Sequence, residues 1–180
     1  NVPLAQYLGD KTKLASFRSP NTIYYPFGCN ASQKKAVENA LTNQVSIIQG
    51  PPGTGKTQTI LNIIANLLLA KKSILVVSNN NSAIENIAEK LEGEGLGFLV
   101  AKLGSVENKE LFIANQKEYP QMDNWKLDDV NSIKKDATQA LKDVSQGFEG
   151  QSKYALLKAE LDALHKEAKY DQMHHDVADE

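Results

Sequence analysis

The segment at residues 50–57, with the sequence GPPGTGKT, constrains the fold of this chain more than any other feature. It matches the pattern G-x-x-x-x-G-K-[ST] at every fixed position, with a β-rich run before it and a long apolar run after it. In such a loop the glycines let successive backbone N–H groups face a phosphate, and the N-terminus of the following helix adds positive potential. The sequence therefore predicts a strand, a phosphate-binding loop and a helix in this order.

Two residues of the loop are the candidate catalytic residues. Lys56 is expected to reach the β- and γ-phosphates of a nucleotide, and the Thr57 hydroxyl is expected to ligate Mg²⁺. The wider nucleotide-binding set within and beside the loop is Gly50, Pro52, Gly53, Thr54, Gly55, Lys56, Thr57 and Gln58. A glycine-rich link without a ligand is the alternative, but the strand and the helix on either side favour a phosphate site.

The apolar pattern around the loop indicates alternating strands and helices. Helical periodicity is expected near 32–41, 56–70, 81–91 and 108–115, and continuous apolar runs typical of buried strands lie at 44–49, 73–78 and 97–104. This order of β-α-β-α-β-α favours an α/β chain with a doubly wound parallel sheet.

The end of the chain differs in charge and in pattern. Residues 116–180 carry 14 Asp and Glu against 9 Lys and Arg, whereas the residues before them carry 8 against 11. Spacings of three and four alternate along Tyr154, Leu157, Leu161, Leu164 and Ala168, as in a seam that pairs with another helix. Glycines at 147 and 150 are expected to separate this helix from an earlier one near 131–145. The seam is then expected to pair with that earlier helix or with a second molecule.

Three parts of the chain follow from these patterns. Residues 1–29 are expected to form an irregular segment, residues 30–118 a nucleotide-binding α/β core, and residues 119–180 an acidic helical insertion or arm. The longest apolar run is too short for a membrane span and contains Asn62 and Asn66, so no membrane is expected as a partner. Cys29 is a lone cysteine and no signal peptide is visible, which favours the cytoplasm, or the nucleus in a eukaryote.

Over residues 27–105 the chain resembles the superfamily 1 helicases, in the branch related to the nonsense-mediated-decay helicase. The block FGCNASQKKAVENAL at 27–41 resembles the Q motif that reads adenine in this family. The resemblance implies that Gln33 pairs with adenine, that Tyr25 or Phe27 stacks on the base, and that ATP is the nucleotide. Asn30 and Gln33 also have the spacing of a helix capping box, a role compatible with the first.

The segment VVSNNNSAIENIAEKL at 76–91 resembles motif Ia of the same family, which grips the backbone of a single nucleic-acid strand. The resemblance implies that Asn80, Asn81 and Ser82 contact DNA or RNA phosphates. Asn79 stands where the family usually has proline. An ordinary Asn/Ser turn that caps the next helix is the alternative.

Two features that a complete helicase motor requires are missing from the sequence. No apolar strand ends in Asp-Glu, since Asp128 and Asp129 follow a polar stretch, and Arg18 is the only arginine. The resemblance therefore implies an incomplete RecA-like P-loop domain, with the other helicase domains elsewhere in a longer protein and little hydrolysis by this chain alone. An AAA+ remodelling ATPase and a nucleotide-binding module without hydrolysis are the alternatives.

Overall fold

The structure is a computed structural model that describes residues 8–9, 14–20, 22–114 and 129–178, the last of these with side chains to residue 170. The chain divides into two units, Asn1–Val130 and Asn131–Glu180. The boundary predicted between core and arm at 118/119 lies outside the described residues. Asp128, which follows a polar stretch in the sequence, lies outside them too. No helix among the described residues is long and apolar enough to cross a membrane.

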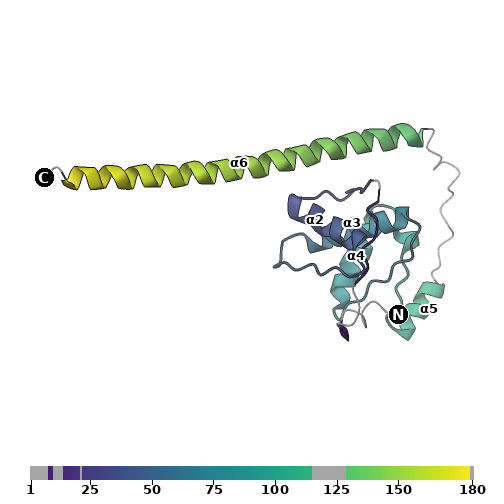
Figure 1. The fold of residues 1–180 in the computed structure, drawn as a ribbon. Helices are drawn as coiled ribbons and strands as arrows, with labels where there is room; N and C mark the ends of the chain where they lie inside the picture. The colour runs from purple at the N-terminus through teal and green to yellow at the C-terminus, as the bar shows by residue number, and fades with distance from the viewer. Residues whose placement is uncertain (1–7, 10–13, 21, 115–128, 179–180) are drawn as a thin grey trace. The chain divides into compact units, whose positions relative to one another are not determined.

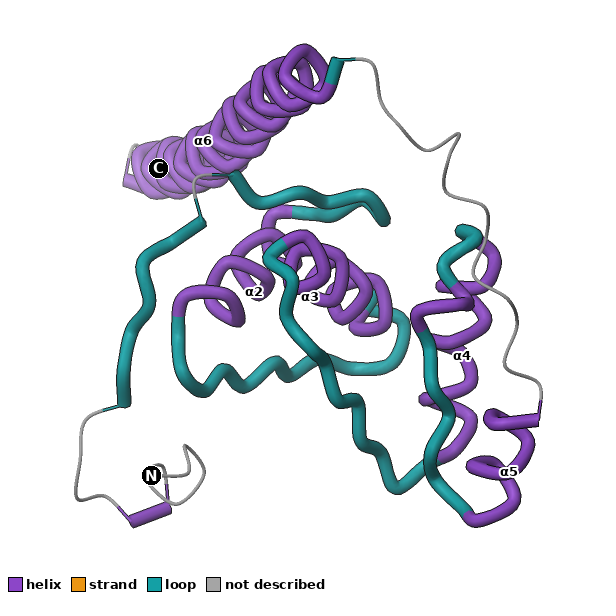
Figure 2. The backbone as a smooth tube through the Cα atoms, turned by 90° about the vertical axis from the view of Figure 1, so that its right-hand side faces the viewer, coloured by secondary structure: helices purple, strands orange, loops and turns teal. Residues whose placement is uncertain are grey.

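Short helices form the first unit (Figures 1 and 2). They are α2 (Ala31–Thr42), α3 (Lys56–Leu69), α4 (Asn81–Gly93), the 3₁₀ turn η1 (Gly97–Leu99) and α5 (Val106–Ala114). The four helices predicted in this part of the chain are therefore confirmed, with starts that shift by up to two residues.

Side-chain caps and glycines set the ends of these helices. Asn30 caps α2 through a capping box, and Asn80 caps α4 by accepting a hydrogen bond from the Ser82 amide. After α4, Gly95 has a φ of 73°, and the Leu96 amide donates to the Leu91 carbonyl at 2.8 Å. This Schellman-type ending turns the chain back toward the core, because only glycine adopts such a φ without strain.

The core of the first unit lies between α3 and α4. Leu61 and Ile64 of α3 are buried against Ile87 and Leu91 of α4. Partly buried apolar residues from the surrounding segments complete this cluster: Phe27, Ile60, Leu68, Ile74, Val76, Leu96 and Val100. Each such side chain contributes about 1.5–3 kcal/mol when fully buried, so the cluster fixes the position of α4 relative to the helix that follows the glycine loop.

The predicted parallel sheet is not confirmed. Among the described residues the structure has no strand, and the runs at 44–49 and 73–78 lie in bends and loops. The strand predicted at 97–104 is wrong at its start, because Gly97–Leu99 forms a 3₁₀ turn. In the described part of the chain the nearest feature to a ladder is an isolated antiparallel bridge between Ser16 and Asn43.

The second run still shows the alternation of a strand. Ile74 and Val76 pack against the core, whereas Leu75 and Val77 are 85% and 79% exposed. A parallel strand is hydrogen-bonded and buried on both faces only when neighbouring strands and covering helices surround it. One apolar face of this run packs within the described residues and the other does not.

The described part of the second unit belongs to one helix, α6 (Val130–Ala178), which Figure 1 shows as continuous. The predicted break at Gly147 and Gly150 is therefore wrong, and so is the predicted pairing of the seam with residues 131–145. A glycine costs a helix interior about 1 kcal/mol relative to alanine, which good helix formers on both sides can offset. The side chains of Tyr154, Leu157, Leu161 and Leu164 are exposed in this unit.

Candidate nucleotide-binding site

The glycine-rich loop connects the run at 44–49 to the first turn of α3. Gly53 and Gly55 have φ values of 82° and 78°, which L-residues with a side chain rarely adopt. Within the loop the Thr54 hydroxyl donates a hydrogen bond to the Pro51 carbonyl at 2.8 Å. Two of the three predicted glycines, Gly53 and Gly55, thus occupy positions where the backbone conformation favours glycine.

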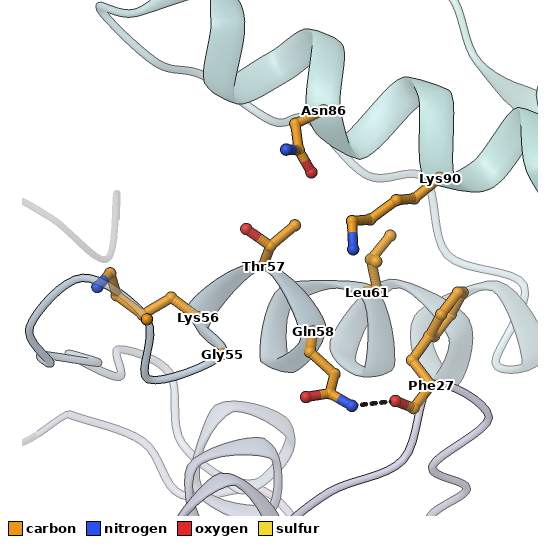
Figure 3. A pocket seen from close by; sticks show the side chains of 9 residues that line it. Phe27, Gly55, Lys56, Thr57, Gln58, Leu61, Asn86 and Lys90 are labelled. Carbon is orange, nitrogen blue, oxygen red and sulfur yellow. Dashed lines mark hydrogen bonds between the residues drawn. The ribbon is translucent and has the colours of Figure 1, made fainter.

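Lys56 folds back over this loop (Figure 3). Its Nζ donates hydrogen bonds to the carbonyl oxygens of Gly50 and Pro51, each at 2.7 Å. A phosphate in the loop would compete with these two neutral carbonyls for the ammonium group. A phosphate carries negative charge and the carbonyls do not, so Coulomb attraction adds to the hydrogen bond and makes the phosphate the favoured partner.

Thr57 follows in the first turn of α3, and its side chain faces the pocket on the side of α4 (Figure 3). Among the described residues its hydroxyl has no hydrogen-bond partner. A hydroxyl held beside a phosphate loop fits the ligand preference of Mg²⁺, which keeps several waters and takes phosphate oxygens as further ligands. No group of three His, Cys, Asp or Glu side chains that could hold a metal occurs in the described part of the chain.

A pocket of about 530 Å³ opens beside the loop, a volume within the usual range for small-molecule sites. Its lining comes from the loop, from α3, from α4 and from one aromatic residue before α2: Phe27, Gly53, Gly55, Lys56, Thr57, Gln58, Leu61, Asn86 and Lys90. Asn86 and Lys90 were not predicted from the sequence as residues of the site. They lie four residues apart on one face of α4, and only the packing of α4 on α3 shows that this face borders the loop.

Gln33 lies behind the loop and is buried. Its Oε1 accepts from the Asn30 amide and the Asn30 side chain accepts from the Gln33 amide, both at 2.9 Å, so the capping box is present. Its Nε2 lies within hydrogen-bond distance of the carbonyls of Thr54 and Gly55, at 3.2 and 3.3 Å. Gln33 therefore holds the loop backbone from the side of α2, and its contact with adenine stays a prediction.

The aromatic residues before α2 divide between pocket and core. Phe27 lines the pocket, and its carbonyl accepts a hydrogen bond from Nε2 of Gln58 (Figure 3). The Tyr25 hydroxyl is buried and has no hydrogen-bond partner among the described residues, and burial together with the nearby Glu38 carboxylate raises the pKa of this phenol. Tyr25 is not among the residues that line the pocket, so of the two predicted stacking residues the structure places Phe27 there.

The three residues predicted to contact nucleic acid lie at the start of α4. Oδ1 of Asn80 accepts from the Ser82 amide at 3.0 Å, and the Asn80 amide donates to the Ser78 hydroxyl at 3.0 Å. The capping alternative is therefore present. Asn80, Asn81 and Ser82 are exposed, none of them lines the pocket, and their contact with nucleic acid stays a prediction.

A glycine-rich loop that opens a helix, followed by Lys and Thr beside a pocket, defines the class of P-loop nucleotide-binding proteins. Residues 28–179 match the family model AAA_11, described as an AAA domain. The chain belongs to this family, which has the P-loop NTPase fold.

The chain is also similar to several helicases. It is 46% identical over 74 residues to the DNA polymerase alpha-associated DNA helicase A of Schizosaccharomyces pombe, across 41% of this chain and 11% of that protein. It is 35% identical over 105 residues to the ATP-dependent helicase upf1 of the same yeast, across 54% and 11%. It is 34% identical over 112 residues to the regulator of nonsense transcripts 1 of Caenorhabditis elegans, across 60% and 10%.

These matches confirm the resemblance to superfamily 1 helicases of the nonsense-mediated-decay branch and identify the matched region as the N-terminal part of the motor. The matched region spans about a tenth of the length of these relatives. No solved structure matches the chain.

Proposed function

We propose that this chain is the ATP-binding part of an ATP-dependent helicase that translocates on single-stranded nucleic acid. The observation that carries the proposal is the arrangement of Lys56 and Thr57 at the start of α3, beside a pocket of about 530 Å³. ATP is the proposed nucleotide and Mg²⁺ the proposed ion. The loop amides and Lys56 would hold the phosphates, and the Thr57 hydroxyl would take part in holding the ion.

Hydrolysis would need groups from outside this chain. In the described structure no carboxylate lines the pocket, and Arg18 is the chain's only arginine. A P-loop enzyme needs a residue that orients the attacking water and cations that stabilise the transition state. We therefore propose that further helicase domains of a longer protein supply both, and that they complete a RecA-like parallel sheet around the exposed face of residues 75–77.

Nucleic-acid binding by Asn80, Asn81 and Ser82 is supported by their exposure at the N-terminus of α4, where backbone N–H groups favour phosphate oxygens. Binding of this kind reads the backbone, so it is expected to be largely independent of sequence and to weaken with salt. The cytoplasm, or the nucleus in a eukaryote, is the proposed location.

The arm is proposed to pair with another helix through its exposed seam. Self-association would bury Leu157, Leu161 and Leu164, which are exposed on α6. Leu161→Asp is expected to abolish self-association in sedimentation experiments and to leave nucleotide binding unchanged, because α6 carries none of the residues that line the pocket. A seam variant that also loses nucleotide binding would show that this helix belongs to the nucleotide-binding core.

The test of the whole proposal is ATP turnover in the full-length protein with and without single-stranded DNA or RNA. Turnover is expected to rise on addition of the strand and to be lost in Lys56→Ala. ATP turnover that changes with neither single-stranded DNA nor single-stranded RNA would favour a remodelling ATPase over a helicase.

A further inference from the structure

Helix α3 carries a row of three amide side chains that its apolar pattern does not explain. Gln58, Asn62 and Asn66 are spaced four residues apart, which places them on one face of the helix. Asn62 is fully buried and Asn66 is 7% exposed, in a helix whose other buried residues include Leu61 and Ile64. Buried amides of this kind are costly unless their hydrogen bonds are satisfied.

The partner of this amide row is the backbone of residues 24–28. Asn66 accepts a hydrogen bond from the Tyr24 amide at 2.9 Å and donates one to the Tyr24 carbonyl at 2.7 Å. Asn62 accepts from the Phe27 amide at 3.1 Å and donates to the Gly28 carbonyl at 2.8 Å. With the bond from Gln58 to the Phe27 carbonyl, both polar backbone groups of Tyr24 and of Phe27 are paired with α3.

The side chains of α3 give the backbone of residues 24–28 the hydrogen-bond partners that a neighbouring strand would give it in a sheet. Backbone N–H and C=O groups that leave water need partners, and a sheet would normally supply them. Here the side chains of one helix supply them, and the same helix carries Lys56 and Thr57 in its first turn. The segment that holds the aromatic residues and the helix that holds the phosphate-binding residues are thereby joined by direct hydrogen bonds.

We propose that Asn62 and Asn66 are positioning residues for nucleotide recognition. They hold residues 24–28 against α3 so that Phe27 forms the wall of the pocket on which the base of the nucleotide lies. The inference rests on the proposed nucleotide function and deepens it, because it assigns the geometry of the base site to side chains on the phosphate-binding helix. Asn62 and Asn66 themselves are not expected to touch the nucleotide, since neither lines the pocket.

Comparing ATP with inorganic tripolyphosphate tests this role, because tripolyphosphate needs the loop but has no base. Asn66→Leu removes both hydrogen bonds to Tyr24 while keeping an apolar helix. We expect the affinity for ATP to fall about tenfold, equivalent to about 1.4 kcal/mol, and the affinity for tripolyphosphate to stay within about twofold. Asn39→Leu, on the exposed side of α2, is the matched control and is expected to change neither affinity.

Asn66→Ser keeps a hydroxyl that can form part of the pairing, and it should show an intermediate loss for ATP alone. It also keeps the test usable if Asn66→Leu does not fold, which circular dichroism would show. Equal losses for both ligands in a folded variant would mean that Asn66 only stabilises α3, and unchanged affinities would mean that the amide row does not position the base site. Either result overturns the inference. A wild-type chain that binds neither ligand rejects the proposed function itself.

Discussion

The side-chain nitrogen of Gln33 lies 2.1 Å from the point where a Cβ atom on Gly55 would stand. Glycine at the start of α3 is therefore favoured twice, by its φ of 78° and because a Cβ atom there would displace the Gln33 amide from its place beside the loop. Because Gln33 also belongs to the capping box of α2, this contact joins the start of one helix to the phosphate loop of the next.

The first prediction separates these two requirements. Gly53→Ala meets nothing within 4 Å and should cost only the strain of a left-handed conformation, about 1–2 kcal/mol of unfolding free energy. Gly55→Ala adds a clash with the Gln33 amide and should cost distinctly more. Urea denaturation of both variants measures the difference, and equal losses would show that Gln33 does not hold the loop as described.

The second prediction concerns the two roles of Gln33. Asn30→Ala removes the side-chain cap of α2 and should cost about 1 kcal/mol of unfolding free energy without altering nucleotide choice. Gln33→Ala also removes the contacts with the loop, and if Gln33 reads adenine it should narrow the difference between ATP and GTP affinity. An ATP-to-GTP ratio that stays constant in Gln33→Ala would leave Gln33 with structural roles alone.

The third prediction concerns the continuity of α6. Gly147→Ala and Gly150→Ala should each stabilise this exposed helix by up to about 1 kcal/mol, because alanine loses less backbone entropy and no neighbour lies within 4 Å of either site. Thermal melting followed by circular dichroism checks this, with Ala155→Gly as the opposite control. A loss of helix content in the alanine variants would indicate a turn at these glycines.

The fourth prediction uses Cys29, the only cysteine of the chain. Burial raises the pKa of its thiol, the Lys34 ammonium lowers it and the Glu38 carboxylate raises it, with burial the largest effect. A raised pKa leaves less thiolate near pH 8, so alkylation should be slower than for a free thiol, and Lys34→Gln should slow it further. Mass spectrometry of the alkylated protein gives the rates, and alkylation of Cys29 as fast as that of glutathione would contradict the partial burial of this side chain.

The sequence predicted the helices of the first unit well because caps and apolar periodicity are local signals. The capping box at Asn30 and the turn at Gly95 act within a few residues, so their effect does not depend on the rest of the fold. The sheet could not be predicted in the same way, since strand pairing depends on distant segments. Leu75 and Val77 carry a strand pattern, yet no strand is paired with them in the described structure.

For the candidate site, the sequence located the loop but not its supports. Lys56, Thr57 and the glycines follow from the motif, whereas the roles of Asn62 and Asn66 depend on residues 24–28, more than thirty positions away. Both asparagines counted in the sequence only as polar interruptions of an apolar run. Similarly, Gly147 and Gly150 suggested a break that the flanking helix formers prevent.

Nucleotide binding at residues 50–57 can be measured by titrating the purified chain with a fluorescent ADP analogue in the presence of Mg²⁺. The wild-type chain is expected to bind saturably, and ATP is expected to displace the analogue. Lys56→Ala is expected to abolish binding, because it removes the side chain that meets the phosphates, while the circular dichroism spectrum stays unchanged. Equal binding by Lys56→Ala and wild type would contradict the assignment of residues 50–57 as the phosphate-binding loop.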